Sequence, residues 1–383
     1  MPVTSQCAGF TRRGVPCRNS VADGAGWCGR CAGVPAPPGP KVAAAAASDF
    51  AAGVDPFAAD PPRWGTELDV DQIARVAASR NADPEILAAI HQTWSGVSFD
   101  IDYALARNPR TPTEAVDALA GHHADRVAME ARRNPSLSPA ARRSLAANAP
   151  YDLAANPAAT AEDLAEAARR HSAAPNHLSA VARHPNLDHG HMAVFAADDT
   201  WQIRYAVAAN PRCDPEILAA LAADESDVVA GQAASHPHLP LASLEAAAAS
   251  TDERVAAGAA ANPAAPPALL AKIVAGNKRA KVLAAAAANN NCPTGALNTL
   301  ATDTRNTVRF AAAKNTATSP DALVVLSASP ESKVRRAVAR HRHTPPAALA
   351  RLAADPHPKV RAEAARNPRT PAAGKAAAGL LSD

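Results

Sequence analysis

A repeat of about 26 residues runs through most of this 383-residue chain and constrains its fold more than any other feature. Asn or His, usually followed by Pro, marks one position of each unit, and seven of the ten steps between successive marks have the same length. The marks are Asn108, Asn134, Asn156, His184, Asn210, His236, Asn262, Asn289, Asn315, His341 and Asn367. A period of this kind is typical of repeat proteins, in which each unit is one small supersecondary structure.

Apolar residues at fixed offsets from the mark predict two short helices in each unit. Pairs such as Leu218 and Leu221 stand one helical turn apart, and pairs such as Val229 and Ala233 do the same further along the unit. A unit of this size cannot bury its own apolar face, so stacked neighbours must share one thin core. The sequence therefore predicts an all-α solenoid. Its abundant alanine and few aromatic residues (3%) suit closely packed short helices.

Residues 341–361, with the sequence HRHTPPAALARLAADPHPKVR, resemble the leucine-rich repeat variant family. The resemblance covers roughly residues 80–370. It implies a right-handed superhelix in which α-helices alternate with 3₁₀-helices. The shortest step, from Asn134 to Asn156, places Arg142 at an otherwise apolar position. A kink or a shortened second helix is expected there.

The N-terminal residues 1–34 carry the strongest chemical motif. Cys7, Cys17, Cys28 and Cys31 have the spacing C-x9-C-x10-C-x2-C, and four thiolates can complete a tetrahedral Zn²⁺ site. So short a segment, with so little apolar bulk, needs a metal in order to fold. The segment resembles the small zinc knuckles of bacterial and phage proteins, although Cys31 stands where they usually have His. Because some proteins of the repeat-variant family carry an N-terminal iron–sulfur cluster, a 4Fe–4S cluster is the alternative to zinc.

Composition divides the remainder of the chain into three parts. Residues 35–62 are rich in Pro and Ala and predict a linker, and residues 63–107, with the aromatic residues Trp64, Trp94, Phe99 and Tyr103, predict an N-terminal cap. Residues 108–383 form the solenoid. No apolar run approaches the length of a transmembrane helix, and the first residues lack the features of a secretory signal. A cytoplasmic protein without a membrane partner is therefore expected.

Residues 331–383 are strongly basic, with eleven Lys/Arg against four Asp/Glu. Equivalent positions of a solenoid project from the same face, so arginines that recur in successive units predict a basic patch for an anionic partner such as nucleic acid. These residues are Arg335, Arg336, Arg340, Arg361 and Arg366. The other interpretation is that they bond to carbonyl groups and to acids such as Asp355 and Glu363 of neighbouring units.

The functional expectation follows from the repeat and from the lack of a catalytic motif. No nucleophile–base pair, Gly-rich phosphate loop or pair of carboxylates stands at a meaningful spacing, so no enzyme is expected. Asn before Pro at a helix end can bond to neighbouring backbone, and its recurrence predicts a structural ladder between units. We therefore expect an interaction scaffold with a protein partner and a structural zinc module. The alternative is a nucleic-acid-binding protein that uses the basic patch and the basic zinc module.

Overall fold

A computed structural model describes residues 4–6, 20–22 and 70–377 of the chain. The chain divides into two compact units, Met1–Ala173 and Ala174–Asp383. Apart from the short antiparallel strands β1 (Thr4–Gln6) and β2 (Ser20–Ala22), every regular element in the described residues is an α-helix, which confirms the predicted fold class. None of the helices in these ranges is both long and apolar enough to cross a lipid bilayer.

In its described part, the first unit contains helices α2 to α9. Their bounds are α2 Val70–Ala78, α3 Pro84–Trp94, α4 Phe99–Arg107, α5 Thr113–Ala120, α6 Asp125–Arg132, α7 Pro139–Asn148, α8 Pro150–Ala154 and α9 Ala161–Arg170. Helix α4 packs against both α2 and α6, so the even-numbered helices form a row. The residues expected to form a cap, 63–107, thus end in helices that continue the pairing of later units.

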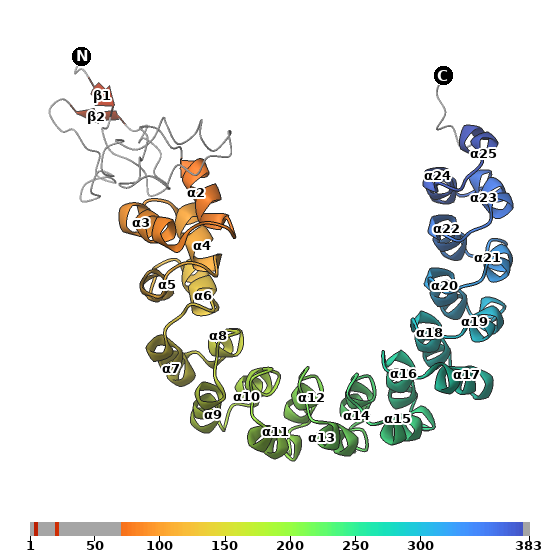
Figure 1. Cartoon of the computed structure of the whole chain (residues 1–383), viewed down its shortest axis with the longest axis horizontal. Helices are drawn as coiled ribbons and strands as arrows, with labels where there is room; N and C mark the ends of the chain where they lie inside the picture. Colours follow the sequence, from red (N-terminus) through yellow and green to blue (C-terminus); the bar gives the residue numbers. More distant parts are fainter. Residues whose placement is uncertain (1–3, 7–19, 23–69, 378–383) are drawn as a thin grey trace. The chain divides into compact units, whose positions relative to one another are not determined.

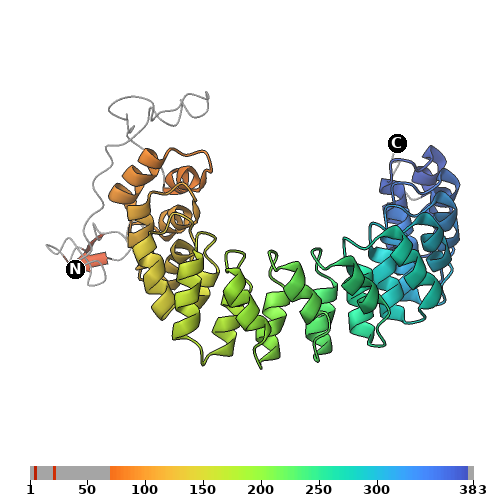
Figure 2. The same cartoon turned by 60° about the horizontal axis from the view of Figure 1, so that its bottom comes forward.

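The second unit contains helices α10 to α25. Their bounds are α10 Pro175–Ala182, α11 His189–Ala196, α12 Trp201–Ala208, α13 Pro215–Leu221, α14 Asp227–Ala234, α15 Leu241–Ala248, α16 Glu253–Ala261, α17 Pro267–Gly276, α18 Ala280–Ala288, α19 Thr294–Ala301, α20 Asn306–Lys314, α21 Pro320–Leu326, α22 Ser332–Arg340, α23 Pro346–Ala353, α24 Pro358–Arg366 and α25 Ala372–Ala377. Even-numbered helices form one layer and odd-numbered helices the other (Figure 1). Figure 2 shows these helices, coloured green to blue, stacked in successive pairs.

The core lies between the two layers, at the positions that the periodicity selects. Leu218 and Leu221 of α13 and Val229 and Ala233 of α14 are all buried, and the equivalent residues of other units are buried too. The 3₁₀-helix that the family resemblance implies is not observed in the described residues, because both helices of a unit are α-helical. Apolar residues four apart share one face at 3.6 residues per turn, whereas a 3₁₀-helix would separate them.

The irregular step from Asn134 to Asn156 has the shortened second helix that was expected. Helix α8 has five residues, and the preceding α7 has ten. Arg142 of α7 is accommodated because its Nη1 donates to the Leu137 carbonyl at 2.7 Å and its Nε donates to Asp163 Oδ2 at 3.1 Å. The carboxylate of Asp163 therefore balances the charge of Arg142 at a position that is otherwise apolar.

The repeated Asn forms the predicted ladder between successive units. Asn262 is fully buried, and its Nδ2 donates to the carbonyls of Ala234 at 2.9 Å and His236 at 2.8 Å in the preceding unit. Its Oδ1 accepts the backbone N–H of Ala264 at 2.8 Å. The same pattern begins in the first unit, where Asn108 donates to the carbonyl of Ala77. Each Asn thus satisfies backbone groups that a helix end leaves without an intrahelical partner.

In some units histidine takes the place of Asn in the ladder, and this makes the stability of the fold depend on pH. His236 Nε2 lies 2.9 Å from the Asn210 carbonyl, and its Nδ1 accepts the backbone N–H of His238 at 3.1 Å, an arrangement that requires the neutral ring. His341 bonds in the same way to the Asn315 carbonyl. Burial lowers the pKa of both histidines, and the bond to the carbonyl only partly opposes this.

We expect the double variant His236→Asn/His341→Asn to lose less stability than the natural chain between pH 7 and pH 5. The unfolded histidines bind protons near pH 6.5, whereas the folded ones resist protonation, so stability falls as the pH drops below that value. The slope is at most about 1.4 kcal/mol per pH unit for each histidine. Urea unfolding at a series of pH values measures it. Parallel pH profiles for the two proteins would contradict the assignment.

Two glycines allow the even-numbered helices α14 and α16 to pack very closely. A Cβ atom on Gly258 would collide with the Gly231 carbonyl oxygen and would lie 3.1 Å from the Ala234 Cβ. We expect Gly258→Ala to lower stability by about 1–3 kcal/mol, because the backbone of α14 must move. The matched control is Gly295→Ala in α19, where a Cβ meets nothing within 4 Å. It should raise stability by up to about 1 kcal/mol through helix propensity, and thermal unfolding distinguishes the two.

Candidate partner-binding groove

The five arginines of the predicted basic patch divide into two groups with different surroundings. Arg335 lies mostly buried, and its Nε and Nη2 donate to the two carboxylate oxygens of Asp355 at 2.7 and 3.0 Å. Its Nη1 donates to the carbonyls of Ser329 and Pro330. Arg361 donates to the carbonyls of Asp355 and Pro356 in the same way. These two side chains hold the loops between helices, as the second interpretation of the arginines predicts.

Asp355 shows how tightly this contact is made. Burial alone would raise the pKa of this carboxyl group, but the hydrogen bonds from Arg335 and from the backbone N–H of His357 outweigh burial and lower it. The same arrangement recurs in α12, where Arg204 bonds to Asp224 of the following unit at 2.7 Å. A guanidinium group occupied in this way has little capacity left for a ligand.

Arg336, Arg340 and Arg366 belong to the second group, whose side chains are partly or largely exposed on the even-numbered layer. Arg336 Nη2 donates to Glu363 Oε1 of α24 at 2.7 Å, and Arg340 Nε lies 3.7 Å from the other oxygen of that carboxylate. The hydrogen bond from Arg336 lowers the pKa of Glu363 most strongly, and the charge of Arg366 contributes as well. Arg340 nevertheless keeps 67% of its side chain exposed, whereas Glu363 is covered. Arg366 is exposed.

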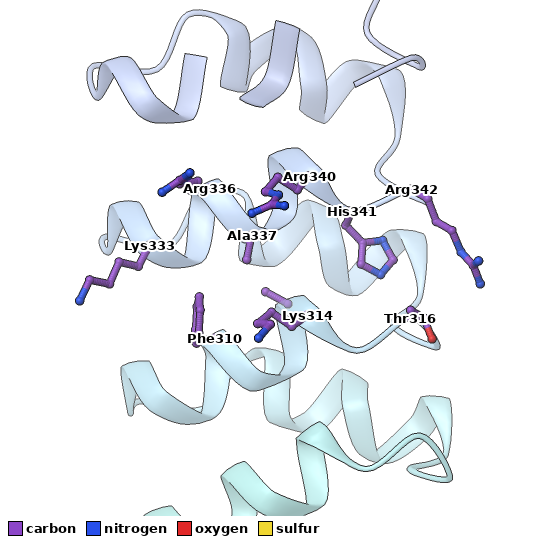
Figure 3. Close-up of a pocket in the computed structure, with 10 residues that line it drawn as sticks. Phe310, Lys314, Thr316, Lys333, Arg336, Ala337, Arg340, His341 and Arg342 are labelled. Atoms are coloured by element: carbon purple, nitrogen blue, oxygen red, sulfur yellow. The ribbon is translucent and has the colours of Figure 1, made fainter. Parts of the chain in front are cut away.

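An open groove of about 760 Å³ runs over α20 and α22 beside these arginines. Phe310, 38% exposed, stands on one side with the ammonium group of Lys314 5.6 Å from its ring centroid. Figure 3 shows Arg340 on α22 and, on the neighbouring α20, Lys314 with Phe310 beside it. Lys333 and Arg342 complete the cationic lining. We call this groove, which is lined by Phe310, Lys314, Lys333, Arg336, Arg340 and Arg342, the basic groove.

Sequence reasoning identified only part of the basic groove. It selected Arg336 and Arg340 but missed Phe310, Lys314 and Lys333. A signal for two of these residues was present in the repeat itself. Lys314 directly precedes the mark Asn315, as Arg340 precedes His341, and Phe310 occupies a position that is alanine in the two preceding units.

The four cysteines proposed as metal ligands, Cys7, Cys17, Cys28 and Cys31, lie outside the described residues. Among the residues that the structure does describe, no group of three or more His, Cys, Asp or Glu side chains is placed to hold a metal ion.

Comparison with known proteins supports the repeat character of the chain at one place. The family model named leucine rich repeat variant matches residues 333–357, which include nearly all of α22 and the whole of α23. No curated protein matches the chain. The chain is similar to the crystal structure of an engineered protein at 18% identity over 77% of this chain and 92% of that one, with a TM-score of 0.30. It is also similar to a designed armadillo repeat protein in complex with the peptide (KR)4, at 13% identity over 80% and 90% and a TM-score of 0.11.

The ladder, the buried positions and the helix pairs themselves define the helical repeat solenoid, since the TM-scores of 0.30 and 0.11 are low. The family match covers a single unit and lies at the basic groove, because Lys333, Arg336 and Arg340 are within the matched residues.

Proposed function

We propose that this chain is a non-enzymatic interaction scaffold and that its second unit binds a protein partner in the basic groove. The observation that carries the proposal is a division among the polar side chains of this unit. Asn262, His341 and Arg335 point inward and hold successive repeats together. Lys314 and Arg340 instead stand exposed beside an aromatic ring on an open helical face.

The same division holds four titratable side chains of the second unit inside the stack, where they cannot act at a reacting centre. A general base needs a side chain that is free to take a proton at the reacting centre. His236 and His341 use both ring nitrogens for backbone groups, and Asp224 and Asp355 are held by arginine. A scaffold needs only a surface of suitable shape and charge, and repeat solenoids present such surfaces along their length.

Affinity capture with matched variants tests the proposed function. The groove variant is Phe310→Ala/Arg340→Ala, and the control is Val325→Ala/Lys272→Ala, which removes one exposed apolar residue and one exposed cation from the odd-numbered layer. We expect nuclease-treated native lysate to yield proteins that bind the natural chain and the control but not the groove variant. Capture that is equal for both variants would contradict the proposal. Capture that disappears with nuclease would instead support the nucleic-acid alternative.

We also propose that Cys7, Cys17, Cys28 and Cys31 bind one Zn²⁺ as a structural ion. The support is the spacing of four thiols in a short segment and the preference of zinc for a closed shell of four thiolates. Elemental analysis of the purified chain should find one zinc per molecule, and a variant with all four cysteines replaced by serine should bind none. A brown protein with iron in place of zinc would identify the 4Fe–4S alternative.

A further inference from the structure

We infer that the basic groove takes an extended acidic segment of a protein partner, with one apolar side chain against Phe310 and carboxylates facing the cations of successive repeats. This inference rests on the proposed function and names the chemistry of the partner. Its basis is charge complementarity. Lys314, Lys333, Arg340 and Arg342 line the groove, and Glu363 is already covered by Arg336 and Arg340.

The repeat sets the spacing of exposed cations along this face of the even-numbered helices, from the groove over α20 and α22 onward to Arg366 at the end of α24. Lys314, Arg340 and Arg366 each directly precede a ladder residue, and all three are exposed. They belong to α20, α22 and α24, which pack side by side in order. Packed helices lie about 8–10 Å apart, and an extended chain advances about 3.3 Å per residue. An extended peptide that crosses these helices therefore meets a cation at about every third residue.

The row of cations that precede the ladder residues extends over only three units of this part of the chain. The residues that precede the ladder marks in α14, α16 and α18 are small and uncharged: Ser235, Ala261 and Ala288. The complementary segment thus spans three units, which corresponds to a short linear motif of fewer than about ten residues.

The aromatic content of the groove favours a peptide over single-stranded nucleic acid. Proteins that bind single strands stack successive bases on several aromatic side chains. Here the position of Phe310 is Ala284 in α18, Arg336 in α22 and Ala362 in α24, so one aromatic ring stands alone along this part of the face. A single exposed ring that lies 5.6 Å from an ammonium group suits one apolar side chain flanked by acids.

Fluorescence anisotropy with defined probes and the full chain tests this inference. The first probe is a labelled twelve-residue peptide with Glu at every third position and one central Phe. The second has the same composition with its Glu residues adjacent, and the third is a labelled twelve-nucleotide single-stranded DNA. The chain variants are Lys314→Glu and, as a matched charge reversal on the odd-numbered layer, Lys272→Glu. Circular dichroism melting confirms that both variants are folded.

We expect the spaced peptide to bind at least tenfold more tightly than the clustered peptide, and Lys314→Glu to weaken it about tenfold because a like charge then faces the ligand. Lys272→Glu should leave binding unchanged. Equal affinity for both peptides, equal loss in both variants, or tighter binding of the DNA would overturn the inference. If no peptide binds while capture of a protein still depends on the groove, the inference fails and the proposed function stands. If no groove-dependent protein is captured either, both fail.

Discussion

Asn289→Ala is expected to lower the free energy of unfolding by about 3 kcal/mol, whereas the same change at the neighbouring Asn290 should alter it by less than about 0.5 kcal/mol. Asn289 is buried, and its Nδ2 donates to the carbonyls of Ala260 at 2.9 Å and Asn262 at 2.8 Å. Its Oδ1 accepts the N–H of Asn291. Alanine removes the side-chain partner of these three backbone groups, two of which accept the Asn289 amide in buried surroundings.

The comparison between the two positions separates the stability that the ladder hydrogen bonds contribute from any general effect of replacing Asn with Ala. Asn290 is exposed in the adjacent turn, and it has the same side chain and nearly the same place in the sequence. Urea unfolding followed by circular dichroism measures both variants. A loss that is equal at the two positions, or absent at both, would show that the ladder does not stabilise the stack.

Asp224→Ala is expected to lower the free energy of unfolding by about 3–5 kcal/mol, because the buried guanidinium group of Arg204 then keeps only the exposed carboxylate of Glu225, 3.3 Å away. Arg204 Nε and Nη2 donate to the two oxygens of Asp224 at 2.7 and 2.9 Å, and both side chains are less than one-tenth exposed. Removing both partners in Arg204→Ala/Asp224→Ala should cost less than removing Asp224 alone, because no charge is then left buried. The free energy of unfolding of each variant supplies the comparison.

An exposed ion pair in the same unit serves as the control for Asp224. Lys281 Nζ lies 3.6 Å from Glu253 Oε2, with 79% and 38% of the two side chains exposed. Glu253→Ala should change stability by less than about 1 kcal/mol, since water solvates the remaining charge. If Asp224→Ala is as mild as Glu253→Ala, the Arg204 contact does not hold successive units together.

Acid should weaken the Arg204–Asp224 contact. Burial would raise the pKa of Asp224, but the hydrogen bonds from Arg204 and from the Ser226 N–H outweigh burial and lower it. A carboxylate with a lowered folded-state pKa contributes its stability above the unfolded pKa, near 3.9, and loses it as the pH falls through the folded value. This window lies below the one in which the ladder histidines act, so the two effects can be separated.

Most of the architecture could be predicted from the sequence, because contacts in a solenoid are made between nearest neighbours and repeat with the sequence. The regular step between marks predicted the helix pairs, the buried Leu and Val positions and the Asn ladder, and all are observed. The short step predicted the short α8. The 3₁₀-helix came from the family resemblance alone, and the spacing of four between Val334 and Val338 shows why an α-helix forms instead.

The candidate site was less accessible to sequence reasoning. Arg335 and Arg340 were grouped in one basic patch, yet they stand five residues apart on the same helix and therefore point about 140° away from each other. Arg335 turns toward the loop and Asp355, and Arg340 turns toward the groove. Helical geometry separates the two directions, but it does not say which one is buried.

The amino-acid sequence by itself determined that this chain stacks short helix pairs and that a recurring Asn or His joins them, because both properties follow from a local period and from the chemistry of one side chain at a helix end. Only the tertiary structure decided which cationic side chains bond to neighbouring units inside the stack and which are exposed to solvent. Asp355 lies 20 residues beyond Arg335, and Glu363 lies 27 beyond Arg336. These pairs form only when successive units adopt a particular rotation, and that rotation leaves Phe310, Lys314 and Arg340 around an open groove.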